Sequence, residues 1–219
     1  METAEYILLI MNCEKYAIKA QTQKNTWLRE MDTIPFFHVL GDPDLHQPYE
    51  FQYDKQRLVI QVEDDYNSLP KKVIRAYAAI RSHFPSVKYV LKTDDDQILQ
   101  TTHTNMFFDT ITGMLERNER QHEKIHYAGN MVRVHQPYLS QYHRVHTELP
   151  EHLPILKTTY CNGRFYLLSA EAIDELLEKK HSIEAEYLED YAIGYHLSDA
   201  KKNTLKHLAS DVYFKDMDA

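Results

Sequence analysis

The sequence predicts an α/β fold in which helices cover both faces of a mixed, mostly parallel sheet. Short apolar segments alternate along the chain with segments of helical spacing, and this order is typical of parallel sheets. Two of the apolar segments end in acidic clusters, at residues 63–65 and 94–96. Open α/β sheets bind ligands at the carboxyl ends of their strands. We therefore expect a functional site where these clusters lie.

Length and composition favour one globular domain. The chain has 219 residues, of which 43% are hydrophobic, and this is enough to bury a sizeable core. No low-complexity or proline-rich tract marks a linker. The formal net charge is −8, and no basic stripe is interleaved with aromatic residues. Nucleic acid is therefore not an expected partner.

Neither a disulfide framework nor a membrane segment is expected. Cys13 and Cys161 lie far apart and have no zinc-binding spacing, so both thiols are expected to be reduced. The apolar run at residues 6–11 is too short to cross a bilayer. It follows Glu2 and Glu5, where a signal peptide would have basic residues. We expect the chain as given to be soluble.

In the first hundred residues, predicted strands alternate with predicted helices. Apolar runs predict strands at residues 5–12, 35–40, 57–62 and 87–92. Helical spacing predicts a first helix at residues 16–31. Before the fourth strand, Ser68 is the expected N-cap of a second helix, with Pro70 in its first turn. That helix should end near Phe84, where Pro85 stops it.

The second half of the chain is less regular. Helices are expected at residues 105–116, 170–180 and within 183–197, and strands at residues 125–134 and 159–169. Gly129 would interrupt the first of these strands, and the polar residues 117–124 predict a loop. Residues 133–154 hold four His and three Pro without a clear period, which indicates an irregular lid or substrate loop. Residues 204–214 are expected to return to the sheet.

The acidic triplet Asp94, Asp95 and Asp96 directly follows the fourth predicted strand. Three adjacent carboxylates repel one another, so their joint ionisation requires water, a cation or a positive group among them. Oxygen ligands of this kind suit Mg²⁺ or Mn²⁺, which take their remaining ligands from water and substrate phosphates. The triplet therefore predicts a metal–diphosphate site, and a solvated acidic turn is the alternative.

Four segments resemble, in the same order, the motifs of the Fringe and β-1,3-galactosyltransferase family (family 31). They are residues 8–10 with 24–27, residues 64–72, residues 89–96 (YVLKTDDD) and residues 160–169 with 189–194. The third segment would contain the DXD motif of the family. The resemblance covers about residues 6–197. The chain departs from the family patterns at Ser68, Pro70, Gln97, Gln100, Arg164 and Phe165.

Members of this family are inverting, metal-dependent glycosyltransferases with the GT-A fold. The resemblance implies a single GT-A domain over residues 1–219. Residues 1–100 would form the nucleotide-binding half, which ends in the acidic triplet, and residues 101–219 the acceptor-binding half. The donor would be a UDP-sugar and the acceptor a hydroxyl of a glycan or glycoprotein. A cytoplasmic bacterial or viral enzyme and a trimmed Golgi-type catalytic domain both agree with this reading.

The resemblance also implies roles for individual acids. Asp94 and Asp96 would flank Mn²⁺ (or Mg²⁺) and the donor diphosphate, with Asp96 as the direct ligand and Asp95 near the ribose. The cation would neutralise the charge that builds on the departing nucleoside diphosphate. Asp190 would be the general base that takes the proton of the acceptor hydroxyl. The alternative for Asp190 is a helix N-terminal acid stabilised by the dipole. Glu189 would orient a neighbouring group or contact the acceptor.

Further residues are expected around the donor. Lys72 would approach the diphosphate or a donor-site carboxylate, although a lysine at a helix start is equally often a surface charge. Met11 and Asn12, at the end of the first strand, would line the nucleotide pocket. Asp42, at the end of the second strand, would line it too.

Histidine and tyrosine residues add two expectations. A histidine after the Glu189-Asp190 pair would complete the metal shell, and His207 suits this role better than His196; a surface histidine is the alternative. The cluster at residues 135–146 would bind an acceptor sugar through aromatic faces and hydroxyls, or be an ordinary surface loop.

Two other functions stay open at this point. A metal-dependent nucleotidyltransferase or phosphohydrolase would also place acids at strand ends. It would, however, need a glycine-rich or basic phosphate-binding loop early in the chain, and the turn at residues 12–15 is not such a loop. A non-catalytic carbohydrate-binding domain would use the acids to bind Ca²⁺ structurally. The sequence predicts neither the donor sugar nor the oligomeric state.

Overall fold

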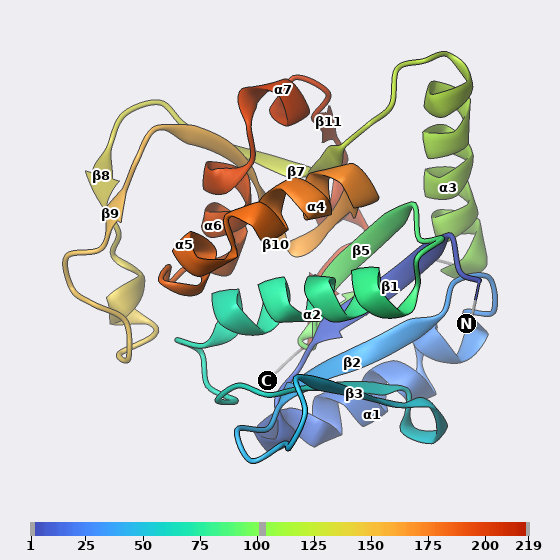
Figure 1. The fold of residues 1–219 in the computed structure, drawn as a ribbon, viewed down its shortest axis with the longest axis horizontal. Coiled ribbons are helices and arrows are strands. Elements are labelled where there is room, and N and C mark those ends of the chain that lie inside the picture. Colours follow the sequence, from blue (N-terminus) through green and yellow to red (C-terminus); the bar gives the residue numbers. More distant parts are fainter. Residues whose placement is uncertain (1–2, 101–103, 218–219) are drawn as a thin grey trace.

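The computed structural model describes residues 3–100 and 104–217, and its centre is an eight-stranded mixed sheet (Figure 1). The strand order is β11-β7-β10-β5-β1-β2-β4-β3. In chain order these strands are β1 (Tyr6–Met11), β2 (Phe36–Gly41), β3 (Tyr49–Gln52), β4 (Arg57–Ile60), β5 (Tyr89–Asp94), β7 (Tyr127–Val134), β10 (Thr158–Ser169) and β11 (Lys206–His207). All run in one direction except β3 and β10, which are antiparallel to their neighbours. The predicted α/β class with a mostly parallel sheet is confirmed.

Helices cover both faces of this sheet. The bounds are α1 (Ala17–Asn25), α2 (Leu69–His83), α3 (Thr104–Arg120), α4 (Ala170–Glu178), α5 (Lys180–Glu184), α6 (Glu189–His196) and α7 (Asp199–Lys202). Helices α2, α4, α5 and α6 pack their apolar side chains on one face. On the other face, α3 and the short turn after α1 pack on β1, β2 and β5. Because β1 is covered on both faces, it consists of a continuous apolar run.

Parallel pairing brings the carboxyl ends of several strands to one edge of the sheet. Met11 at the end of β1 pairs with Asp94 of β5 on one side and with Val39 of β2 on the other. Strand β4 runs parallel to β2 in turn. The segments that follow these four strands therefore lie along a common edge, and both acidic clusters belong to them.

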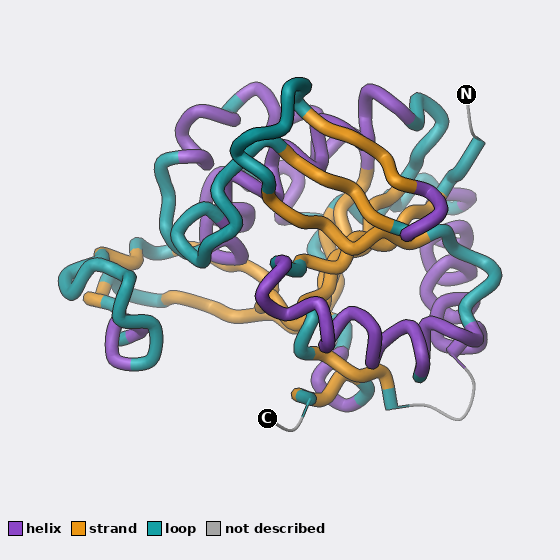
Figure 2. Tube along the Cα trace, turned by 90° about the horizontal axis from the view of Figure 1, so that it is seen from below, coloured by secondary structure: helices purple, strands orange, loops and turns teal. Residues whose placement is uncertain are grey.

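Residues 135–157 include an arm that projects from the body of the molecule (Figures 1 and 2). Strands β8 (Tyr138–Leu139) and β9 (Pro154–Ile155) pair antiparallel in this arm. A small apolar core joins the arm to the start of α6, with Leu149 and Leu153 on the arm and Tyr191 on the helix. The sequence predicts an irregular loop here, and the structure instead has a short hairpin because these apolar residues give it a core.

The last strand, β12 (Phe214–Asp216), pairs antiparallel with β6 (Gln97–Leu99), the strand that directly follows the acidic triplet. Phe214 is fully buried, and its ring stacks on Phe165 with 4.8 Å between centroids. The predicted return of residues 204–214 to the sheet is confirmed by β11, which pairs with β7. Strand β12 belongs to a separate two-stranded sheet.

Two predicted helix boundaries and one predicted capping hydrogen bond were wrong. The helix expected at residues 16–31 is two pieces, since Thr26 leaves the helical region (φ −111°, ψ −112°) and a 3-10 turn follows at Trp27–Glu30. Helix α3 continues to Arg120, into the segment expected to be a loop. Ser68 precedes α2 as expected, but its side chain makes no capping hydrogen bond.

Two strands also differ from the expectation. Strand β3 was not predicted, because its residues are all half-buried at the sheet edge and make no apolar run. Gly129 does not interrupt β7. A Cβ at this glycine would lie 2.7 Å from the Cβ of Cys161, so the glycine allows β7 to approach β10 closely.

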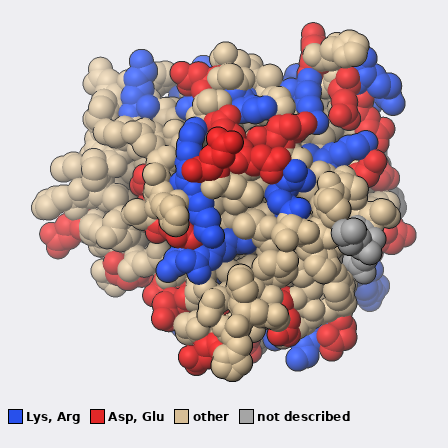
Figure 3. Space-filling view, viewed as in Figure 1, with Lys and Arg blue, Asp and Glu red and all other residues tan. Residues whose placement is uncertain are grey.

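Charged side chains on the viewed face are mixed in sign. Figure 3 shows acidic and basic groups next to one another over the helices of this face. Two pairs join neighbouring helices there, Arg81 with Asp174 at 2.7 Å and Arg75 with Glu184 at 2.7 Å. Within residues 3–100 and 104–217, no helix combines the length and apolarity that crossing a membrane requires.

Candidate active site

The acidic triplet lies at the end of β5, between β1 and β10, and a buried lysine holds its first member. The Lys92 side chain is 1% exposed, and its Nζ lies 2.6 Å from Asp94 Oδ1 and 3.0 Å from Glu189 Oε2. It also donates to the carbonyl of Gly163 at 3.0 Å. The ammonium is buried because two carboxylates surround it, Asp94 from the same strand and Glu189 from the distant helix α6.

Glu189 is part of this buried group and does not face the surface. Its side chain is 3% exposed, and Oε1 accepts a hydrogen bond from the Tyr166 hydroxyl. The Tyr166 hydroxyl also lies 2.8 Å from that of Tyr77 in α2. Burial raises the pKa of Asp94 to about 7, with Lys92 opposing the rise and Glu189 adding to it. Glu189 thus contacts Lys92 and Tyr166 and is buried away from the surface.

Asp190 begins α6 beside the same glycine. Its Oδ2 accepts from Gly163 N at 3.1 Å and its Oδ1 from Tyr191 N at 2.7 Å. Burial raises the pKa of Asp190 to about 6, and the neighbouring Glu189 contributes in the same direction. A Cβ at position 163 would lie 3.2 Å from Asp94 Oδ2 and 3.8 Å from Asp190 Cβ. The absence of a side chain at Gly163 thus allows both acids to lie close to this point of β10.

On the side of β1 and β2, a second lysine is buried rather than exposed. Lys72 Nζ lies 2.7 Å from Asp64 Oδ1 and donates to the carbonyl of Asn12 at 2.7 Å. Asp64 also accepts from Gly41 N and Glu14 N, each at 2.8 Å. The surface alternative for Lys72 is thereby excluded. Asp64 thus connects the chain at the ends of β1, β2 and β4. In the sequence, only the motif at residues 64–72 indicated a role for this residue.

A small polar pocket with a volume of about 30 Å³ lies between α1 and the sheet next to Asn12. Besides Asn12 it is lined by Ala17, Ala20, Gln21, Lys24, His38, Leu40 and Arg57. The structure thus places Asn12, but neither Met11 nor Asp42, at this pocket. Met11 is 3% exposed in the core, and Asp42 Oδ1 accepts from Asp44 N in its own turn.

A hydrogen-bonded chain joins this pocket to the acidic triplet. His38 Nε2 lies 3.0 Å from Gln23 Oε1. Gln23 Nε2 donates to the carbonyls of Asp94 at 3.1 Å and Gln97 at 2.8 Å. Because Gln23 uses its amide nitrogen as the donor, His38 must donate through Nε2. Burial, with the charges of Lys24 and Arg57, lowers the pKa of His38 to about 3.

The second and third acids of the triplet face different surroundings. The Asp95 side chain lies 3.9 Å from Lys19 Nζ of α1, and burial raises its pKa to about 6. Asp96 Oδ1 accepts from Gln97 Nε2 at 2.8 Å. The two acids are thus directed to α1 and to the β6–β12 sheet, respectively.

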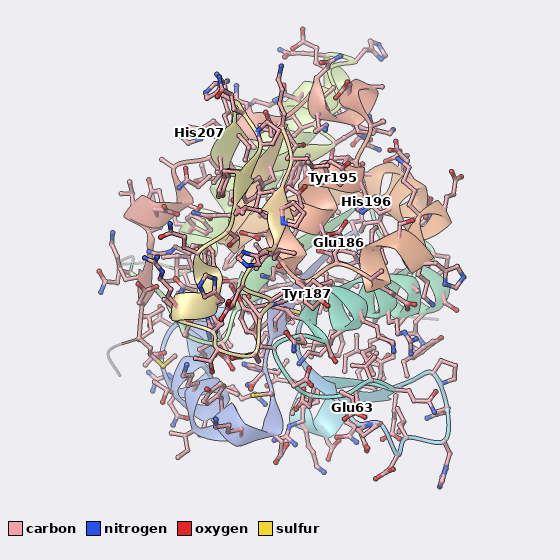
Figure 4. The ribbon with its side chains drawn as sticks, turned by 90° about the vertical axis from the view of Figure 1, so that its left-hand side faces the viewer. Glu63, Glu186, Tyr187, Tyr195, His196 and His207 are labelled. Carbon is pink, nitrogen blue, oxygen red and sulfur yellow. The ribbon has the colours of Figure 1, made fainter. Side chains whose placement is uncertain are left out.

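The structure does not bring either candidate histidine to the triplet. His207 lies on β11, and both β7 and β10 separate it from β5. Its Nδ1 accepts from Met131 N at 3.3 Å. His196 Nε2 lies 3.0 Å from Glu186 Oε1 at the other end of α6. Figure 4 shows His207 well apart from His196 and Glu186.

The end of β5 provides carboxylates of the kind that bind a cation together with a substrate. Among the residues that the structure describes, no group of three His, Cys, Asp or Glu side chains could hold a metal ion alone. Mg²⁺ and Mn²⁺ at phosphate sites use one or two carboxylates and take other ligands from water and phosphates. Asp94 ends β5 and Asp96 lies in the turn that follows it. The chemistry of these two side chains suits a site of this kind without a histidine.

Aromatic side chains surround Asp190 on the side of the arm. The Tyr66 and His146 rings stack with 4.0 Å between centroids and 13° between planes. The pKa values of Tyr66, Tyr142 and Tyr160 are all raised. For each of them burial is the largest cause and the charge of Asp190 is the second. Asn67 Nδ2 also donates to the carbonyl of Glu148 in the arm at 3.2 Å. The arm thus reaches the acid at the start of α6.

Comparison with known proteins gives consistent matches. A family model described as "Galactosyltransferase" matches residues 23–207. Human UDP-GalNAc:beta-1,3-N-acetylgalactosaminyltransferase 1 is 26% identical over 148 residues, which are 68% of this chain and 41% of that protein. The rat protein of the same name is 25% identical over 131 residues, which are 60% of this chain and 37% of that protein. The chain spans about two fifths of the length of the curated relatives it matches.

Two solved structures are similar to this chain. The mannosyltransferase Ktr4p from S. cerevisiae has a TM-score of 0.50 and 9% identity, with 94% of this chain and 68% of that chain covered. A glycosyltransferase involved in the glycosylation of the major capsid of PBCV-1 has a TM-score of 0.46 and 14% identity, with 82% and 65% covered. The first likeness shows a glycosyltransferase fold, in agreement with the predicted GT-A class.

Proposed function

Because the chain belongs to the galactosyltransferase family, we propose that it transfers a sugar from a UDP-sugar to a hydroxyl of a glycan or glycoprotein. We further propose that the transfer inverts the anomeric carbon and depends on a divalent cation. The observation that carries this proposal is the close approach of Asp94 and Asp190, which come from different elements, to Gly163. Asp94 ends the central strand β5, where a diphosphate would bind. Asp190, in the first turn of α6, would be the base on the other side of the site.

Asp190 is the proposed general base. Both of its oxygens accept a backbone N–H, which fixes the direction of the carboxylate and leaves a lone pair on each oxygen. With a pKa of about 6, the carboxylate is mostly ionised at neutral pH and still binds a proton readily. It would take the proton of the acceptor hydroxyl as that oxygen attacks the sugar. The family match does not favour the nucleotidyltransferase, phosphohydrolase or binding-domain alternatives.

Asp94 and Asp96 would hold Mn²⁺ or Mg²⁺, and Asp95 would face the ribose. When bound, the cation supplies positive charge for the departing nucleoside diphosphate. Lys92 keeps Asp94 in place, and Asp64 with Lys72 fixes the segments around Asn12. We propose that the nucleoside binds near Asn12, beside the small pocket whose lining includes several hydrogen-bonding side chains.

Residues 1–100 would thus serve the donor, and residues 101–219 would serve the acceptor. The second assignment is supported by the arm, whose rings lie near Asp190. Tyr142 is 54% exposed there, so it is free to contact a ligand. Flat aromatic faces pack well against the apolar face of a sugar ring.

Calorimetric titration of UDP with and without Mn²⁺ tests the proposed function, followed by transfer assays with a panel of UDP-sugars. We expect binding that requires Mn²⁺ and that Asp96→Ala weakens strongly. Asp174→Ala is the control, because Asp174 is an exposed acid on α4 whose partner is Arg81. If the wild-type protein does not bind UDP under either condition, the transferase proposal is wrong.

A further inference from the structure

Strand β12 lies directly against the turn that carries the acidic triplet. Asp216 pairs with Gln97 and Phe214 with Leu99 in the β6–β12 ladder. The next residue, Met217, donates its N–H to the carbonyl of Asp96 at 2.6 Å. The backbone of Asp96 is therefore held by a segment more than a hundred residues away in the sequence.

The Gln97 side chain joins two carboxylates. Its Nε2 donates to Asp96 Oδ1 at 2.8 Å and to Asp216 Oδ1 at 2.9 Å. Gln97 is 4% exposed, and its Oε1 has no hydrogen-bond partner among the described residues. The Gln97 amide oxygen has no partner among these residues, whereas its nitrogen donates to two carboxylates. These charge-assisted hydrogen bonds therefore orient the amide. The position of Asp216 therefore determines how Gln97 holds Asp96.

Asp216 is held in turn by Arg164 on β10. Arg164 uses one guanidinium nitrogen for Asp216 Oδ1 at 2.8 Å and the other for the carbonyl of Phe214 at 3.1 Å. Phe165, the next residue, stacks on the Phe214 ring. Three positions at which the chain departs from the family motifs, Gln97, Arg164 and Phe165, thus all contact β12.

We propose that β12 positions the Asp96 carboxylate for the cation, through a chain of contacts from Arg164 to Asp216 to Gln97. These three are positioning residues, because each acts on the cation only through Asp96. Partners that orient a ligating carboxylate affect metal affinity although they do not touch the metal. The inference rests on the proposed function, in which Asp96 binds the cation together with the UDP diphosphate.

Calorimetry of UDP in the presence and absence of Mn²⁺ tests this inference on the full chain. We expect Asp216→Ala, Arg164→Ala and Gln97→Val each to weaken Mn²⁺-dependent UDP binding by about 10- to 100-fold. Binding of UDP without Mn²⁺ should change little. The double variant Arg164→Ala/Asp216→Ala should lose no more than either single variant, because both act through one chain of contacts.

The control for this experiment is another arginine–aspartate pair. Arg81 and Asp174 are 23% and 50% exposed, close to the 26% and 67% of Arg164 and Asp216, but they join α2 to α4. Asp174→Ala should therefore leave Mn²⁺-dependent binding unchanged. A second measurement needs no metal: the Gln97 side-chain amide signals of the apo protein should shift in Asp216→Ala and not in Asp174→Ala.

Three outcomes would overturn the inference, and they are distinguishable. If wild type binds UDP with Mn²⁺ but Asp216→Ala and Arg164→Ala bind as tightly as Asp174→Ala, then β12 only packs against the turn. If wild type shows no Mn²⁺-dependent binding, then the proposed function fails and this inference fails with it. Asp216→Glu, which retains the carboxylate, should recover most of the affinity, and equal loss in that variant would indicate a purely structural effect.

Discussion

Lys92 carries one buried positive charge that two carboxylates share. Its partners Asp94 and Glu189 come from β5 and α6, and the side chains of Lys92 and Glu189 are 1% and 3% exposed. Breaking a buried pair by removing one partner typically costs about 3–5 kcal/mol, because the other charge stays buried without compensation. The group therefore fixes the end of β5 relative to the start of α6. Because Asp190 directly follows Glu189, this contact also fixes the position of Asp190.

Replacing Asp190 tests its role as a base. Asp190→Asn retains the shape of the side chain and one of its two backbone hydrogen bonds, because its amide has a single acceptor oxygen, and it cannot take up a proton. We expect the rate of sugar transfer to fall by about 10²- to 10⁴-fold, with Mn²⁺-dependent UDP affinity unchanged. Because burial raises the pKa of Asp190 to about 6, the wild-type rate should decrease as the pH falls below 6. Initial rates between pH 5 and pH 8 measure this.

The sign of this pH dependence follows from the state that the reaction requires. A base must be ionised, and below its pKa the proportion of ionised Asp190 decreases tenfold per pH unit. Asp190→Asn should lack this decrease in its residual rate. A variant that keeps wild-type turnover would show that Asp190 is only the N-terminal acid of a helix.

The acids of the site were predictable from the sequence, whereas their partners were not. Asp94, Asp95 and Asp96 follow an apolar run, and Asp190 belongs to a recognisable acidic pair. The contact of Lys92 with Glu189 joins residues 97 positions apart, and no local pattern encodes it. His207 seemed suitable as a ligand because it follows the acidic pair. Sheet order, which local sequence does not determine, places two strands between His207 and β5.

At the scale of elements, α6 lies unusually close to β10. A Cβ at Gly194 of α6 would be 2.7 Å from Tyr160 Cα and 3.0 Å from Thr159 O. No side chain fits between the helix and the strand at this point. This approach is what places the first turn of α6, with Asp190, next to Gly163 of the same strand.

Gly194→Ala should therefore destabilise the protein. The added methyl meets backbone on β10, which has little freedom to move, so we expect the free energy of unfolding to fall by about 2 kcal/mol or more. Gly113→Ala on α3 is the matched control, because its Cβ would meet only the flexible end of Arg117 at 3.5 Å. That change should stabilise by about 0.5–1 kcal/mol, since alanine favours helices. Urea unfolding of both variants measures the difference, and equal effects would contradict this account of α6.

Elements with continuous apolar runs were predictable, and those that depend on a local break or on tertiary contacts were not. Strands β1, β2, β4 and β5 are buried parallel strands, and each appears in the sequence as such a run. The interruption at Thr26 has no helix-breaking residue to indicate it. Strand β3 gains its structure only by pairing with β4 at the sheet edge. The arm becomes ordered through a core that it shares with α6.

At the scale of the whole molecule, buried groups respond to pH in opposite directions. Burial raises the pKa values of Asp95 and Asp190, so the folded protein binds protons that the unfolded chain has released, and stability falls as the pH rises. His38 has the reverse effect. Burial lowers its pKa to about 3, so the unfolded chain binds a proton below pH 6.5 while the folded protein does not. The pH profile of the wild-type protein is therefore the sum of opposing contributions.

A variant of His38 isolates one of these contributions. His38 is 1% exposed and lies between the pocket and the Gln23 chain, so its linkage is not screened by water. Above pH 7 the residue is neutral in both states, and His38→Gln should lose a constant amount of stability from altered packing. As the pH falls from 6.5 to 4, the wild type loses about 1.4 kcal/mol of stability per pH unit relative to the variant, or about 3 kcal/mol in total.

Urea unfolding at several pH values measures this difference, with His181→Gln, whose side chain is 98% exposed, as the control. A difference between wild type and His38→Gln that stays constant with pH would mean that His38 takes up its proton at the same pH in the folded protein as in the unfolded chain, and the account of its lowered pKa by burial would be wrong.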